Sequence, residues 1–137
     1  MAEVITFDTG QKTFDINGKC EISFNPYDVF FLGRVTDAAK KLDTLQSELQ
    51  TLGEDWAIIY QKSKETDAKM REVIDGLFQT PICDVIFADV SLFAIGNGLP
   101  LWSNLLFAVV DHMDAGLEDE KKKAQVRIRK YSEKYKK

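Results

Sequence analysis

The chain has 137 residues, of which 45% are hydrophobic and 11% aromatic. A chain of this length folds as one domain and buries about two thirds of the surface that its unfolded form exposes, so it needs neither a disulfide nor a metal to fold. The composition excludes an intrinsically disordered chain. The formal net charge of −4 divides unevenly, because residues 121–137 sum to +8 and residues 1–120 to −12.

Residues 3–24 are predicted to form a small antiparallel β-meander. Apolar and polar residues alternate in three runs, with Thr9-Gly10 and Asn17-Gly18 between them. Asn-Gly is a strong hairpin signal because both turn positions require a positive φ. A small sheet with one apolar face is marginal alone and must lie on another element. The apolar members of the runs are Ile5 and Phe7, then Phe14 and Ile16, then Cys20, Ile22 and Phe24.

Residues 26–78 are predicted to form a long hairpin of two helices. Asn25-Pro26 suits the start of the first helix and Gly53 its end. The second helix is expected to open at Asp55 and to run to about Phe78, and its polar middle predicts a pair that projects from the main core. The first helix carries a seam of about three heptads, and the second a shorter apolar face. The seam comprises Phe31, Val35, Ala38, Leu42, Leu45, Leu49 and Leu52, and the face comprises Trp56, Ile59, Met70, Ile74 and Leu77.

Residues 82–113 are predicted to form an apolar pair of helices, over 82–95 and Leu101–Met113, joined by a Gly-Asn-Gly-Leu-Pro turn. The uncharged stretch Val90–Val110 has the length of a membrane span. The turn at its centre argues against one, because a broken helix leaves backbone groups unpaired in lipid. The pair is apolar nearly all round, so it is either the central core or a surface for self-association.

Residues 117–137 are predicted to form a basic helical tail on a single domain of residues 1–116. Acidic residues at its start and lysines at its end suit the helix dipole. Its Lys and Arg side chains could bind phosphates, and Tyr131 and Tyr135 could stack on bases. The acidic body and a pI of about 5.0 are unlike those of a dedicated nucleic-acid binder. We therefore expect a solvated or partner-docking tail.

The residues that could carry catalysis form no recognised pattern. His112 is the one histidine, and Asp111 and Asp114 do not converge with it on a single point. Cys20 and Cys83 have neither metal-ligand nor disulfide-framework spacing, although Cys83 lies near a predicted helix start, where a thiol pKa can be lowered. We expect two buried free cysteines, no enzyme activity, no metal and no cofactor. The N-terminus lacks a signal-peptide pattern, which predicts a cytoplasmic protein.

The order of these features resembles that of the small tail assembly chaperones of long-tailed bacteriophages of Gram-positive hosts. An Ile-Asn-Gly turn precedes a charged heptad helix and a polar second helix. The apolar stretch LFQTPICDVIFADVSLFAIGNGLP then meets a helix, and the chain ends in a Lys-rich segment that reads RKYSEKY. The resemblance covers most of the chain from Phe14 onward, is most specific over residues 70–135, and is one of overall layout. The β-meander is more pronounced than an all-helical chaperone would have.

The resemblance implies a non-enzymatic protein that binds the tape measure protein before the tail tube polymerises, keeps it soluble and self-associates. A heptad helix and an apolar pair suit the binding of amphipathic helices in a groove. An acidic body favours solubility and complements basic client segments. We expect the client to bind the apolar pair at eight residues: Val85, Ile86, Phe87, Val90, Phe93, Trp102, Leu105 and Leu106.

Two other classes remain open. The first is a structural tail-completion or connector subunit, whose meander would add strands to a neighbour's sheet. The second is a helical protein-interaction module, such as a secreted helical-hairpin partner. Secreted hairpins of that kind carry Trp-x-Gly at the turn, whereas this chain has Gly53-Glu54-Asp55-Trp56.

Overall fold

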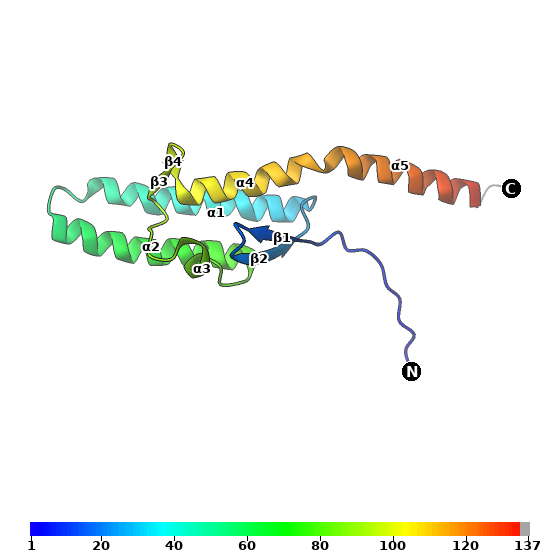
Figure 1. Cartoon of the computed structure of the whole chain (residues 1–137), viewed down its shortest axis with the longest axis horizontal. Helices are drawn as coiled ribbons and strands as arrows, with labels where there is room; N and C mark the ends of the chain where they lie inside the picture. Colours follow the sequence, from blue (N-terminus) through cyan, green and yellow to red (C-terminus); the bar gives the residue numbers. More distant parts are fainter. Residues whose placement is uncertain (135–137) are drawn as a thin grey trace.

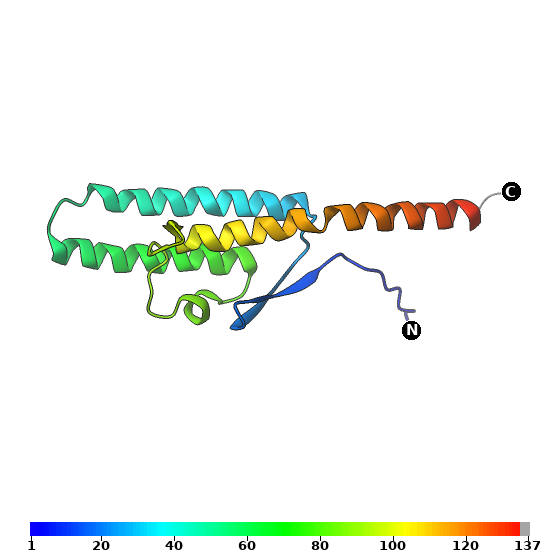
Figure 2. The ribbon, with the colours of Figure 1, turned by 45° about the horizontal axis from the view of Figure 1, so that its top comes forward.

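Two long helices, α1 (Val29–Ser47) and α2 (Trp56–Phe78), form an antiparallel hairpin, and α4 (Leu101–Ala115) lies along α1 (Figure 1). The computed structural model describes residues 1–134. It confirms the predicted fold class, mostly α with a small antiparallel β-sheet at the N-terminus. α5 (Leu117–Lys134) follows α4 and extends beyond the body in both ribbon views (Figure 2). Tyr135 and the last lysines of the predicted tail lie outside the described residues.

Aspartates cap the two helices of the hairpin. The Asp55 carboxylate accepts a hydrogen bond from the Ala57 amide at 3.0 Å, which confirms the predicted start of α2. The first helix starts later than predicted, because Asp28 rather than Asn25 caps it and accepts from the Phe30 amide. α2 ends at Phe78 as predicted, where Gln79 takes a left-handed φ of 57°.

The heptad seam is buried only along the part of the hairpin that α4 and the β-hairpin cover. Its first four residues lie in the core, whereas the last three are half-buried around a short 3-10 helix, η1 (Glu48–Thr51). The tip of the helical hairpin projects past the other elements (Figure 1). Trp56 at this tip is 78% exposed, so its predicted place on a buried face is wrong. Met70, Ile74 and Leu77, nearer the body, are buried as expected.

The predicted meander is a hairpin of two strands, β1 (Lys12–Ile16) and β2 (Cys20–Phe24). Its Asn-Gly turn is confirmed, with φ of 54° at Asn17 and 70° at Gly18. The predicted first strand, with Ile5 and Phe7, is wrong. Residues 1–11 belong to no strand, and both of those side chains are exposed.

The predicted helix over residues 82–95 is also wrong. α3 (Cys83–Phe87) has five residues and ends at Ala88, which has a φ of 46°. Turns then lead to a second small hairpin of β3 (Ile95–Gly96) and β4 (Leu99–Pro100), which contains the predicted Asn-Gly turn. No helix within residues 1–134 combines the length and the apolar character that crossing a bilayer requires.

Aromatic stacking fixes the β-hairpin on the helical hairpin. The Phe24 ring stacks on Phe14 of β1 and on Phe31 of α1, with ring centroids 4.7 and 4.4 Å apart. Phe78 of α2 packs against Phe24 and Phe31, at 6.3 Å from each. Phe24 therefore joins three elements in one cluster.

The joint between α4 and α5 depends on a glycine. A Cβ atom at Gly116 would collide with the hydroxyl of Tyr27, which lies in the turn between β2 and α1. The Lys12 ammonium lies 5.1 Å from the centre of the Tyr27 ring and 3.6 Å from the Glu120 carboxylate of α5. The start of β1, this turn and the start of α5 therefore meet at one end of the body.

We expect Phe24→Ala to lower the free energy of unfolding by about 3–5 kcal/mol, because it removes a buried ring that three elements share. Phe30→Ala is the matched control, since Phe30 is 75% exposed, and it should cost less than about 0.5 kcal/mol. Urea denaturation of both variants measures the difference. Similar losses in the two variants would show that the cluster does not anchor the hairpin.

Candidate functional site

An apolar groove of about 650 Å³ runs along the outer edge of β1, a volume within the usual range of binding pockets. Every residue from Thr13 to Asn17 lines it, whereas β2 contributes only Ile22 and Phe24 from its inner face. β1 pairs only with β2 within the described residues, so the edge that faces the groove is unpaired. The opposite wall comes from α3 and α4 and comprises Ile86, Phe87, Leu101, Asn104, Leu105, Ala108, Val109 and His112.

The polar side chains at the groove are largely occupied within the protein. The Asn104 amide donates to the Gly96 carbonyl at 2.7 Å, and the Asp15 carboxylate accepts from the Gly18 amide. The His112 ring lies against Phe14, with centroids 5.4 Å apart. The groove therefore offers apolar walls and the free backbone groups of an edge strand, which together can hold a peptide segment.

The eight residues predicted to bind the client do not form one surface. Ile86, Phe87 and Leu105 line the groove. Trp102 and Leu106 line a separate hollow of about 320 Å³ between α4 and α1. Val85 and Val90 are exposed, and Phe93 is half-buried.

The structure also decides between core and surface for the apolar pair. Four of the eight residues are core members with at most 9% of their surface exposed: Phe87, Trp102, Leu105 and Leu106. The Trp102 indole additionally donates to the Gln46 side chain of α1 at 2.6 Å. These four residues show little surface to a partner in this conformation, so the eight residues present no single continuous face. The part of the site that sequence reasoning missed is β1, although the apolar alternation of Phe14 and Ile16 had marked it as a face that lies on something.

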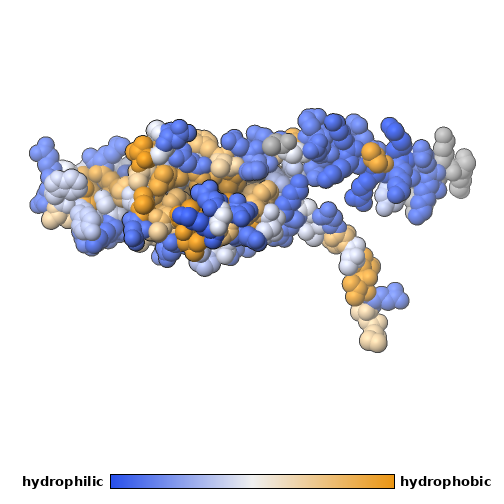
Figure 3. Space-filling view, viewed as in Figure 1, coloured by the Kyte–Doolittle hydropathy of each residue, from blue (hydrophilic) through white to orange (hydrophobic). Residues whose placement is uncertain are grey.

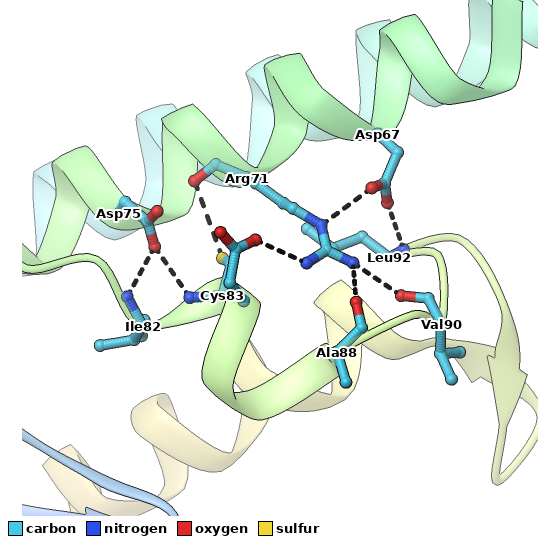
Figure 4. A network of polar contacts seen from close by, with 9 residues as sticks. Asp67, Arg71, Asp75, Ile82, Cys83, Ala88, Val90 and Leu92 are labelled. Carbon is cyan, nitrogen blue, oxygen red and sulfur yellow. Dashed lines mark hydrogen bonds and ion pairs between the residues drawn. The ribbon is translucent and has the colours of Figure 1, made fainter. Parts of the chain in front are cut away.

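Arg71 of α2 holds the wall that α3 contributes to the groove (Figure 4). Its guanidinium donates to Asp67 at 2.8 Å and to Asp84 at 2.9 Å. It also donates to the carbonyls of Ala88 and Val90, at 3.0 and 2.9 Å. Partial burial acts to lower the Arg71 pKa, but the hydrogen bonds to Asp84 and Asp67 outweigh it, so the pKa is raised and the group stays charged.

Two aspartates on the same face of α2 hold backbone amides of this segment (Figure 4). Asp67 accepts from the Leu92 amide at 2.8 Å, and Asp75 accepts from the Ile82 and Cys83 amides at 2.9 and 3.0 Å. Asp67, Arg71 and Asp75 follow one another at intervals of four residues, which places them on one side of a helix. The i, i+4 spacing of these three charged residues was the available sequence signal, in a helix whose polar middle had predicted only a pair that projects from the main core.

The cysteines do not have the environment of reactive thiols. Burial raises the pKa of Cys83, and the neighbouring Asp75 carboxylate raises it further, which opposes the lowering that a helix start could produce. Burial and Asp15 also raise the pKa of Cys20. Within residues 1–134, no three His, Cys, Asp or Glu side chains lie close enough together to hold a metal ion.

Comparisons with known proteins give this chain no relative. The sequence matches no known protein family, and neither a curated protein nor a solved structure matches it.

We expect Arg71→Ala to lower the free energy of unfolding by about 2–3 kcal/mol, because it leaves one Asp67 oxygen and two backbone carbonyls without their partner. Hydrogen exchange should accelerate at the Leu92 amide and stay slow at the Ile82 and Cys83 amides, which Asp75 holds. Lys69→Ala is the control, because Lys69 is an exposed residue of the same helix. Unchanged exchange at Leu92 would show that Arg71 does not fix this segment.

A thiol reagent at neutral pH should modify Cys20 at least tenfold faster than Cys83, because Cys83 is fully buried and Cys20 is not.

A thiol whose pKa is raised in the folded state destabilises that state once the pH exceeds its unfolded pKa of about 8.5. Stability should therefore fall as the pH rises from about 8.5, and Cys83→Ala should reduce this fall. Mass spectrometry of the labelled sites and denaturation across pH measure the two effects. Equal labelling rates would contradict the assigned burial.

Proposed function

We propose that this chain is a non-enzymatic tail assembly chaperone of a long-tailed bacteriophage. It acts in the host cytoplasm and holds apolar segments of the tape measure protein before the tail tube forms. The observation that carries the proposal is the apolar groove beside an unpaired strand edge, on a body whose residues 1–120 sum to −12. The resemblance in the order of sequence features supplies the identity of the client.

The groove suits a chaperone because it takes apolar side chains and makes few specific polar demands. Apolar contact is non-directional and scales with buried area, so successive segments of a long client can use the same walls. Figure 3 shows hydrophobic surface over α3, β3 and the adjoining part of α4. The exposed Val85 and Val90 extend this apolar area beyond the groove.

The charge distribution separates the client-binding body from α5. α5 is hydrophilic along nearly all of its visible surface (Figure 3), and its residues from Lys121 to Lys134 are exposed. An acidic body attracts basic client segments, which favours encounter with the client, and its net charge favours solubility despite the apolar groove. The basic helix remains available for a different, acidic surface.

Co-expression with the tape measure protein tests the proposal. The large protein should be recovered in the soluble fraction only when this chain is present, and the two should be captured together. Ala108→Asp should reduce the captured amount at least tenfold, because it places a charge in the apolar groove. Ala108 is exposed, so the variant should stay folded, and Ala57→Asp at an exposed position of α2 is the matched control.

Capture that is unaffected by Ala108→Asp, with the client soluble, would place binding elsewhere on the chain. If no complex forms and the purified chain assembles into a ring of fixed stoichiometry, the structural tail subunit is the better explanation. The unpaired edge of β1 favours that second candidate, because an edge strand can pair with a neighbouring subunit.

A further inference from the structure

The first eleven residues form an arm that leaves the body at the start of β1 (Figure 1). Val4, Ile5 and Phe7 are 85%, 89% and 80% exposed, and Figure 3 shows hydrophobic surface along the arm. Ile5 and Phe7 alternate with Thr6 and Asp8, the period of a strand with one apolar face. The arm therefore has the sequence of a strand but, in this chain, no strand to pair with.

The base of the arm carries it away from its own groove. The Thr9 carbonyl accepts from the Asn25 amide at 3.0 Å, and the Gly10 amide donates to Asp8 at 2.7 Å. Gly10 has a φ of 76°, and a Cβ there would lie 2.6 Å from Asn25 Nδ2. To reach the β1 edge of the same chain, the backbone would have to reverse at the residues that these bonds hold.

The groove has the shape that such a strand requires. Residues of both parities in β1 line it, so it follows the edge of the strand rather than one face of the sheet. A strand paired with that edge directs alternate side chains between the hairpin and α4, where the walls are apolar. The segment from Glu3 to Asp8 spans six residues, and the lining segment from Thr13 to Asn17 spans five.

Charge and size also fit the arm. Lysines lie at both ends of the slot, Lys12 at the start of β1 and Lys19 just beyond the turn, and Glu3 and Asp8 lie at the two ends of the arm segment. Lys12 already lies 3.6 Å from the Glu120 carboxylate, so Lys19, which donates to the Ile86 carbonyl of the groove wall, is the lysine left for an acidic end of the arm. When two copies exchange arms, each copy contributes the eight residues 1–8 of its arm and the fifteen residues that line its groove. Together these two sets reach the about 20–30 residues per side of a stable interface.

We propose that the arm of one copy pairs with β1 of a second copy and places Ile5 and Phe7 in its groove. Each β-hairpin then becomes a three-stranded sheet, and the strand that the sequence predicts forms between chains. Such exchange of a terminal segment is a low-cost route to association, because it uses contacts that the fold already offers. The inference does not rest on the proposed function, since it concerns the purified chain alone.

Light scattering coupled to size exclusion, across a range of concentrations, tests the arm. The unmodified chain should self-associate, and the double variant Ile5→Asp/Phe7→Asp should be monomeric, with at least a tenfold weaker association constant. Val4→Asp is the matched control, because residue 4 has the opposite strand parity and should leave association within about threefold, a difference of less than 1 kcal/mol. A monomeric unmodified chain, or equal effects of the two arm variants, would overturn the proposal.

Ala108→Trp tests the groove, because a large side chain at this exposed lining position fills the slot without disturbing the core. It should abolish self-association, whereas Ala57→Trp on α2 should not. Mixing Ala108→Trp, which keeps its arm, with the Ile5→Asp/Phe7→Asp variant, which keeps its groove, should restore a mixed complex. Failure to form it, with both variants folded by circular dichroism, would overturn arm-in-groove pairing. An unmodified chain that self-associates but captures no client would instead count against the proposed function alone.

Discussion

The second half of the fold depends on the hydrogen bonds of the Arg71 guanidinium, which hold α3 and the turn after it on α2. A helix through residues 82–95 would use the Ala88 carbonyl to accept the Leu92 amide. Arg71 takes that carbonyl, Asp67 takes that amide, and the helix stops. Charge-assisted bonds of this kind are stronger than the neutral bonds they replace. The chain therefore changes direction after α3 and continues into β3, β4 and the start of α4.

The groove exists because two separate supports hold its walls apart. The Arg71 and Asp75 contacts fix α3 on α2, and the stacked rings around Phe24 fix the β-hairpin on α1 and α2. The two walls meet at the Phe14 and His112 rings, whose centroids lie 5.4 Å apart, and the space between β1 and α4 stays open beside this contact. A protein interior is close-packed, and an apolar gap of this size persists only where rigid elements keep it open.

Local signals in the sequence were sufficient for the parts of the fold that local chemistry decides. The Asn17-Gly18 turn, the Asp55 cap and the end of α2 at Phe78 follow from φ preferences and hydrogen bonds between near neighbours. The short α3 was not predictable in this way, because a side chain far away in sequence stops that helix. Three of the eight predicted site residues do line the groove, but the other wall comes from β1, and hydrophobicity alone could not distinguish a buried Trp102 from an accessible one.

The contact between Gly116 and Tyr27 lies at one end of the long axis of the molecule. Because Tyr27 occupies the space of a side chain there, and Lys12 bridges Tyr27 and Glu120, the exposed arm and the basic α5 both leave from the same end of the body. The opposite end is the tip of the helical hairpin (Figure 2), where Trp56 is exposed. The long axis therefore has two chemically different poles, and copies joined through the arm are oriented by the pole from which it emerges.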